Sequence, residues 1–223
     1  MGMPPASTDE GSMGLERLVF FSDAVLAIVI TLLVLPLAAE VDLTEGGGLA
    51  HQVWALWPRM LSFVISFLVI GQFWIGHHRL FVLVRRYDQR LLWLNLIFLL
   101  TVSFMPFPTA LVGAHSTPQD HFAAVFYAAS LTLASLTFTG TSLYARRAGL
   151  LDLSVDGDTA AYLLTRAVVT TVLFLASVGA AFLGGLRAGL LFWVLLIPVA
   201  RLLLARRHYA PERAGQSRAT RSR

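Results

Sequence analysis

The sequence predicts an all-α integral membrane protein with six transmembrane helices per subunit. Of its 223 residues, 57% are hydrophobic and 13% are charged, and the mean hydropathy is +0.70. Soluble domains carry about 25% charged residues. The apolar residues form stretches of membrane-spanning length, and the arginines lie in alternate connections between them. Helix is the required conformation, because inside lipid each backbone polar group must be satisfied within its own segment.

Six apolar stretches reach the roughly 20 residues that a helix needs to cross a bilayer. They run over residues 17–38, 53–80, 91–113, 122–145, 160–183 and 188–208. Pro106 and Pro108 are expected to kink or end the third helix, and only a tight hairpin fits between the last two. We therefore expect a cytoplasmic N-terminal segment 1–16, a transmembrane domain 17–208 and a disordered, Arg-rich cytoplasmic tail 209–223.

The arginines predict the orientation. They follow the second and fourth spans and crowd the C-terminal end, whereas the loop after the first span carries Glu40, Asp42 and Glu45 and no arginine. Positive residues favour the cytoplasmic side, so both termini are expected there. The basic balance thus predicts contact with membrane lipids rather than nucleic acid. The absence of cysteine excludes disulfides and thiolate metal sites.

The first span has two distinct faces. At about 100° per residue, Ile28, Thr31, Leu32 and Leu35 cluster within one arc, while Asp23 points to nearly the opposite side. An acid inside a membrane span is costly and by default marks function. Periodicity alone leaves two interpretations of the apolar stripe, an ordinary packing seam or the lining of a pore.

A motif in this span distinguishes the two interpretations. The string Arg17-x-x-x-Phe21-Ser22-Asp23-Ala24, followed by Ile28, Thr31 and Leu35, resembles the signature of the lysosomal potassium channel called transmembrane protein 175 and of its prokaryotic relatives. The resemblance continues through the run from Phe73 to Arg79, Asn95 and Pro106. It covers roughly residues 17–110, and the later spans agree only in hydropathy and placement.

The resemblance implies a channel subunit of a prokaryotic plasma membrane. Prokaryotic members of the family carry one six-span repeat and form homotetramers, in which the first helix of each subunit lines a central pore that prefers potassium to sodium. The pore-lining positions of the family fall on Ile28, Thr31 and Leu35, with Leu32 as a further one. Like the family, this chain has no TVGYG-type filter string.

These inferences converge on a potassium-selective cation channel with a hydrophobic constriction formed by first-helix side chains. Thr31 would add a ring of hydroxyls, unless its oxygen bonds the carbonyl of Ala27 instead. The only small partner expected is the permeant K⁺: we expect no catalytic residue, no metal site and no cofactor. A secondary transporter or a proton-conducting protein is the alternative.

The polar residues away from the stripe predict a second set of contacts. We expect a buried network that joins the first three spans and holds the pore helix, with Asp23 accepting a hydrogen bond from a histidine or an indole. Its candidate members are Arg17, Phe21, Ser22, Asp23, Trp74, His77 and Asn95. The alternative is that His77 and His78 lie at the membrane interface and contact only water.

The acidic loop after the first span suggests one further role. The first helix would run outward, so the negative end of its dipole would point to the outer mouth. Glu40, Asp42 and Glu45 of each subunit would add carboxylates there and concentrate cations. The alternative is a merely solvated loop.

Overall fold

The computed structural model describes residues 8–39, 49–114, 121–152 and 157–208, with the backbone alone for 8–12, 49 and 186–208. The described chain is helical, and its elements are α1 (Thr8–Leu32), α2 (Leu35–Ala38), α3 (Leu49–Ala55), α4 (Trp57–Leu83), α5 (Gln89–Ser103), α6 (Pro106–Ala114), α7 (His121–Arg147) and α8 (Gly157–His208). Within the described residues, five stretches are long and apolar enough to cross a membrane: Met13–Ala38, Trp57–Leu83, Gln89–Ala114, His121–Arg147 and Gly157–Gly185. The prediction of a helical membrane protein is therefore confirmed. Segments 1–7 and 209–223 lie outside the described residues.

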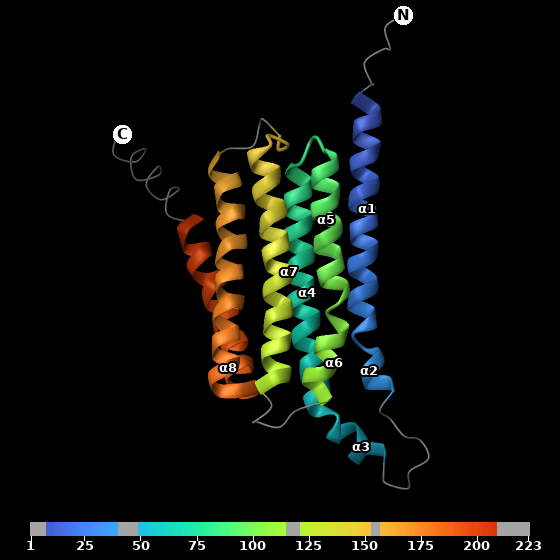
Figure 1. The fold of residues 1–223 in the computed structure, drawn as a ribbon, viewed down its shortest axis with the longest axis vertical. Helices are drawn as coiled ribbons and strands as arrows, with labels where there is room; N and C mark the ends of the chain where they lie inside the picture. Colours follow the sequence, from blue (N-terminus) through green and yellow to red (C-terminus); the bar gives the residue numbers. More distant parts are fainter. Residues whose placement is uncertain (1–7, 40–48, 115–120, 153–156, 209–223) are drawn as a thin grey trace, which may run out of the picture.

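Helix α8 contains a reversal at Gly185. This residue has φ 63° and ψ −156°, a backbone conformation that glycine adopts without the steric penalty of a side chain. The ribbon after it folds back along the first part of α8 (Figure 1). The expected sixth span, 188–208, lies in this returning part, where side chains are not described, so its assignment as a membrane span stays a prediction.

Pro36 interrupts the first span, which we expected to be one continuous helix over 17–38. The span is Met13–Ala38 and so agrees with the expected extent, but its helix is not continuous, since α1 (from Thr8) stops at Leu32 and a separate turn of helix, α2, follows. Proline has no N–H to donate to Leu32, and its ring crowds that carbonyl. The backbone tightens instead, with the amide of Val34 bonding the carbonyl of Thr31 at 3.3 Å. Leu35 consequently belongs to α2.

Prolines also break the third span, as predicted. Helix α5 ends at Ser103 and α6 begins at Pro106. The amide of Met105 bonds the carbonyl of Val102 at 3.0 Å, a tighter connection than the helical one. The two pieces still form one membrane-length segment.

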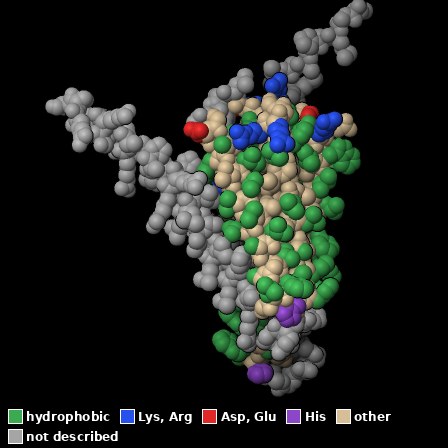
Figure 2. Space-filling view, turned by 60° about the vertical axis from the view of Figure 1, so that its left-hand side comes forward, with side chains coloured by type: hydrophobic (Ala, Val, Ile, Leu, Met, Phe, Trp, Pro, Cys, Tyr) green, Lys and Arg blue, Asp and Glu red, His purple; other side chains and the backbone are tan. Residues whose placement is uncertain are grey.

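The helices stand side by side, with α1 at one edge of the bundle and α8 at the other (Figure 1). Helix α1 packs on α4 and α5, α5 packs on α7, and α7 packs extensively on α8. The core between them is apolar and holds fully buried side chains such as Leu26, Phe98 and Leu131. Hydrophobic side chains cover the length of the bundle and arginines gather at one end (Figure 2), the distribution expected of a membrane protein.

At the arginine-rich end, the turn between α4 and α5 contacts the connection between α7 and α8, and we call this contact the joint. Val84 forms an isolated antiparallel bridge with Leu151. Beside it, the guanidinium of Arg85 bonds the carboxylate of Asp152 at 2.6 Å. This joint fixes the α4–α5 turn against the α7–α8 connection.

Candidate pore helix and its buried partners

The four stripe residues lie outside the packing of the chain's own helices. Ile28 and Leu35 are each 57% exposed, Leu32 is 39% exposed, and Thr31 is exposed as well. The opposite side of α1 is buried against α4 and α5, and its buried residues are Leu18, Ser22, Leu26 and Val29, followed by Leu33 just after the helix. Among the described residues the stripe is therefore not a packing seam, and it is free to meet lipid, water or other copies of the chain.

The hydroxyl of Thr31 donates to the carbonyl of Ile28 at 2.7 Å. The expected alternative partner, the carbonyl of Ala27, is not the one used. Because the hydroxyl hydrogen points back along the helix, the oxygen presents its lone pairs to the exposed side. Thr31 thus adds an acceptor to an otherwise apolar stripe.

A hydrogen-bonded chain joins α1 to α5 and α4 on the buried side. The Ser22 hydroxyl donates to the carbonyl of Leu18 at 2.9 Å, so its oxygen accepts from the Asn95 amide nitrogen at 2.8 Å. The Asn95 amide oxygen lies 2.9 Å from Nε2 of His77. Ser22, Asn95 and His77 are all fully buried. The chain of directional bonds fixes the rotation of α1 about its own axis.

The ring of His77 is held in one tautomer by these contacts. Its Nε2 faces an acceptor oxygen, so that nitrogen carries the hydrogen. Its Nδ1 is buried and bonds to no described residue. The ring stacks on Phe81, with centroids 4.3 Å apart, and on Phe98 at 5.8 Å. A neutral imidazole fits this apolar sandwich, since an unpaired buried charge is costly.

Asp23 has a different partner from His77. Its carboxylate accepts from the indole Nε1 of Trp74 at 3.0 Å, so of the two donors expected for Asp23 the structure has the indole. Trp74 also stacks on His78, with ring centroids 5.9 Å apart. Trp74 and His78 are exposed while His77 is buried, so these three residues of α4 do not share one environment.

Two expected members of the network stand apart from it. Arg17 is exposed and makes no hydrogen bond or ion pair with a described residue, and Phe21 is 51% exposed beside the stripe. The third group of candidates, Glu40, Asp42 and Glu45, lies outside the described residues. Within the described part of the chain, no cluster of three or more histidine or acidic side chains is arranged to hold a metal ion.

A second buried chain of hydroxyls was not predicted from the sequence. Thr109 donates to the carbonyl of Met105 at 2.8 Å and lies 2.8 Å from the Ser66 hydroxyl, which lies 2.7 Å from the hydroxyl of Tyr127. Since the hydrogen of Thr109 is used, Ser66 donates to Thr109 and Tyr127 donates to Ser66. Helices α7, α4 and α6 are thereby tied together. Single serines and threonines in apolar helices gave no signal for this pairing.

Asp88, at the arginine-rich end, was missed although its signal was visible. Its side chain accepts from the amide of Leu91 at 2.8 Å and caps α5, and it also accepts from the hydroxyl of Tyr144 on α7. The Tyr144 hydrogen bond, followed by the Leu91 amide, lowers the pKa of Asp88 below its ordinary value. An aspartate directly before a helical run is a recognisable N-cap, whereas the tyrosine contact is long-range.

The chain is similar to known channel proteins. Residues 17–106 match the family model described as the endosomal/lysosomal potassium channel TMEM175. A protein of Streptomyces collinus named as a potassium channel is 37% identical over 170 residues, which is 74% of this chain and 82% of the relative. Another, from Chamaesiphon minutus, is 40% identical over 124 residues, covering 55% of this chain and 61% of the relative.

A solved structure is similar over most of the chain. It is the crystal structure of a lysosomal potassium-selective channel TMEM175 homolog from Chamaesiphon minutus, with a TM-score of 0.72 and 29% identity over 86% of this chain and 98% of that one. The family consists of ion channels, not enzymes. The extent and identity of these matches show that the chain belongs to the TMEM175 family of potassium channels.

Proposed function

We propose that this chain is one subunit of a homotetrameric potassium-selective channel in which Ile28, Thr31, Leu32 and Leu35 line a shared central pore. The observation that carries the proposal is the exposure of this stripe, which lies on the side of α1 that faces away from α4 and α5 and continues at Leu35 of α2. The bacterial relatives are named potassium channels, and the similar solved structure is that of a potassium-selective channel homolog; both support potassium as the permeant ion.

The buried chain behind α1 supports a pore role for its exposed side. Exposure in a single chain is also what a lipid-facing helix would have, but lipid contact does not require a fixed rotation. The bonds of Ser22 to Asn95, and of Asn95 to His77, hold α1 in one rotational position. A helix that must present particular side chains to an axis needs this restraint.

An apolar constriction explains a preference for potassium over sodium. Four copies of Ile28 and Leu35 around an axis would form hydrophobic rings, which close by dewetting and open with small helix movements. An ion that passes such a ring loses water ligands without receiving oxygen ligands in return. Sodium is the more strongly hydrated ion, so the ring passes potassium more easily. The Thr31 oxygens offer weak compensation, and the selectivity is modest.

The proposal includes the topology that the sequence predicts. The arginine-rich end faces the cytoplasm of a prokaryotic plasma membrane, both termini are cytoplasmic, and the sixth span is 188–208. In this orientation the loop with Glu40, Asp42 and Glu45 is at the outer mouth. Neutralising all three acids should then lower single-channel current at low salt, where surface charge is least screened. Unchanged current would remove this role of the loop.

The reversal potential under a potassium–sodium gradient is the direct test. The purified full-length protein is placed in planar bilayers with potassium on one side and sodium on the other. We expect a reversal potential displaced toward the potassium equilibrium value. Ile28→Ala and Leu35→Ala should change both conductance and reversal potential. Leu100→Ala is the matched control, because Leu100 is an equally apolar, 70% exposed side chain that lies on α5 and not on the proposed pore helix. No cation current, or equal effects of all three substitutions, would refute the proposal.

Proton conduction is a second candidate because of the names of more distant relatives. The mouse protein named endosomal/lysosomal proton channel TMEM175 is 32% identical over 160 residues, which is 32% of its length. A pH gradient across the same bilayers, with no potassium or sodium gradient, distinguishes the two. A reversal potential that follows the proton gradient would favour protons over potassium.

A further inference from the structure

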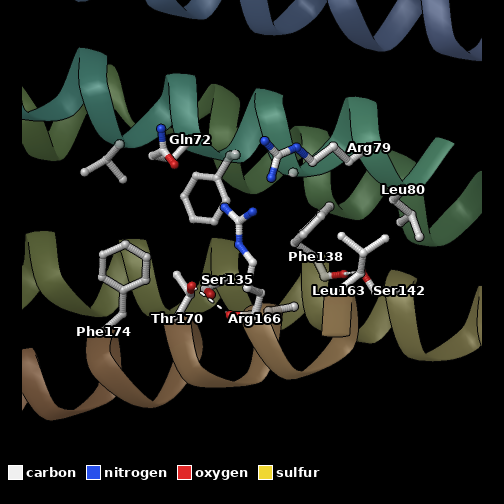
Figure 3. Close-up of a pocket in the computed structure, with 14 residues that line it drawn as sticks. Gln72, Arg79, Leu80, Ser135, Phe138, Ser142, Leu163, Arg166, Thr170 and Phe174 are labelled. Atoms are coloured by element: carbon white, nitrogen blue, oxygen red, sulfur yellow. Dashed lines mark hydrogen bonds between the residues drawn. The ribbon is translucent and has the colours of Figure 1, made fainter. Parts of the chain in front are cut away.

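A cavity of about 80 Å³ lies between α4, α7 and α8, on the far side of α4 from α1. It is well above the roughly 10–15 Å³ that one water molecule requires. Phe73, Phe138 and Phe174 form its apolar part, as Figure 3 shows for the last two. The cavity is separate from the stripe of α1 and from the Ser22–Asn95–His77 chain, and the proposed pore does not use it.

Two arginines enter this cavity from opposite walls. Arg79 comes from the last turns of α4 and Arg166 from α8, and their guanidinium groups point into the same space (Figure 3). Among the described residues, no aspartate or glutamate lines the cavity. Neither guanidinium makes a hydrogen bond or ion pair with a described residue. The returning segment 186–208 contains no acid either, so it has no carboxylate to offer.

The neutral polar groups that line the cavity are Gln72 and the hydroxyls of Ser135, Ser142 and Thr170; they can accept hydrogen bonds but carry no charge to balance the two guanidinium groups. Ser142 donates to the carbonyl of Phe138 at 2.9 Å, and Thr170 donates to the carbonyl of Arg166 at 2.9 Å. Ser135 pairs with Thr171 at 2.8 Å. These hydroxyl hydrogens are used, so the hydroxyl oxygens remain as neutral acceptors, and none of them supplies negative charge to the two guanidinium groups, each of which has about five N–H donors.

Arg79 is exposed and Arg166 is half-buried, so the two like charges face each other at an accessible edge of the bundle, where a counter-charge can reach them. Charged side chains in spanning segments are costly and normally pair or reach water. Arg79 lies about one turn before the end of α4, at the end of the bundle where the arginines gather. This is the level at which lipid headgroups meet a membrane protein, and planar guanidinium groups match phosphate oxygens with paired hydrogen bonds.

We propose that this cavity binds a phosphate oxyanion between Arg79 and Arg166, and that its source is the headgroup of an anionic phospholipid of the adjacent leaflet. A bound headgroup would add a polar bridge between α4 and α8, which already meet through the rings of Phe73 and Phe174, with centroids 6.0 Å apart. The proposal does not depend on which residues line the pore. Free phosphate has the same chemistry, and the test below separates the two sources.

The test measures binding to the full-length protein purified in detergent, by mass spectrometry of the intact protein and by thermal unfolding. The probes are phosphatidylglycerol, phosphatidylcholine and inorganic phosphate. We expect phosphatidylglycerol to bind more tightly than phosphatidylcholine and to raise the unfolding temperature. Arg79→Gln and Arg166→Gln should each weaken phosphatidylglycerol binding about five- to tenfold.

The matched control is Arg146→Gln, since Arg146 is exposed at the same end of the bundle but does not line the cavity. It should leave the affinity within about twofold of the wild type. Arg79→Lys and Arg166→Lys keep the charge and should recover part of the binding, which a merely misfolded variant would not.

Each outcome decides the proposal. A phosphatidylglycerol preference that both glutamine variants lose and Arg146→Gln retains supports the headgroup. If inorganic phosphate raises the unfolding temperature and phosphatidylglycerol does not, and both glutamine variants lose this rise, the oxyanion site is supported but its lipid source is overturned. Equal affinity of the wild type for both phospholipids with no effect of phosphate, or equal losses in all three glutamine variants, overturns the proposal. None of these outcomes bears on ion conduction, so failure here leaves the proposed function standing.

Discussion

Helix α1 meets α5 through the bond between Ser22 and the Asn95 amide, which His77 of α4 extends, whereas α7 meets α8 through hydroxyl pairs. On the α1 side, Asn95 bonds both Ser22 and His77 in a fully buried site. On the α8 side, the hydroxyl of Thr171 lies 2.8 Å from that of Ser135 and 2.9 Å from that of Thr139. Both sides make polar contacts in an apolar bundle, but they differ in whether a group that loses its partner can find another acceptor.

The difference lies in what each group does when its partner is lost. A serine or threonine hydroxyl can return to the carbonyl one turn back, as Thr171 does with Ala167 at 3.0 Å. The ring N–H of His77 and the amide of Asn95 have no such local acceptor. The α1 side therefore specifies one arrangement, and the α8 side tolerates several. The family model covers residues 17–106, the part of the chain that contains the specific contacts.

The largest expected effect on stability comes from a comparison of two residues of α1, one buried and one exposed. Leu26 is fully buried in the core, so Leu26→Ala should lower the free energy of unfolding by about 2–5 kcal/mol through the cavity it leaves. Ile28→Ala, two residues away on the exposed stripe, should cost less than about 1 kcal/mol while it changes conductance. Thermal unfolding in detergent and bilayer currents measure the two effects. If both substitutions destabilise equally, the stripe is not free of the subunit's packing.

The next largest effect is expected in the Ser22–Asn95–His77 chain, whose groups are harder to replace than the hydroxyl pairs. Asn95→Leu leaves the Nε2 hydrogen of His77 buried without an acceptor, and should cost about 1–3 kcal/mol. His77→Phe combined with Asn95→Leu removes both partners, and the new ring would lie between Phe81 and Phe98. The double variant should therefore be more stable than Asn95→Leu alone, as thermal unfolding would measure. A double variant that is additively worse would contradict the assigned pairing.

Much of this arrangement follows from the sequence. The parts that do not follow from it were missed for physical reasons. Apolar length and arginine placement predicted the helical membrane fold, and the motif around Asp23 predicted the family. The break after Leu32 was missed because the apolar pattern was followed through Pro36, although a proline there removes a helical bond. The partners of Ser66 and Asp88 were missed because hydroxyl and carboxylate contacts between distant helices leave no periodic trace. Spacing does not reveal which histidine an asparagine bonds.

A smaller effect is expected on the α8 side. Thr171→Val removes the hydroxyl that Ser135 and Thr139 share. Hydrogen bonds between membrane helices average about 0.6 kcal/mol, and both remaining hydroxyls have backbone carbonyls within reach. The loss in thermal unfolding should thus be well below that of Asn95→Leu. A loss as large as that of Asn95→Leu would remove the distinction between the two sides.

The smallest effect on stability is expected at Asp88, which links α5 to α7: its side chain caps α5 and accepts a hydrogen bond from Tyr144 of α7. Asp88→Asn keeps the cap, because asparagine is an equally good N-cap residue, and changes little except the charge. The pKa of Asp88 is lowered from its ordinary 3.8 by the Tyr144 hydrogen bond and the Leu91 amide. A depressed pKa means that the folded state binds fewer protons, so the charged group stabilises the fold above pH 3.8, and this contribution is lost as the pH falls through the folded value.

The unfolding temperature of the wild type should therefore exceed that of Asp88→Asn by a small, constant amount at neutral pH, and the difference should vanish only below about pH 3.8. Tyr144→Phe removes the largest cause of the shift and should move this loss to higher pH. Differences between variants cancel the titration of the other carboxylates, which all of them share. If the difference in unfolding temperature already disappears between pH 6 and 5, the carboxylate of Asp88 is not stabilised by these bonds. The contact between the α4–α5 turn and the α7–α8 connection would then depend on the Arg85–Asp152 pair and the Val84–Leu151 bridge.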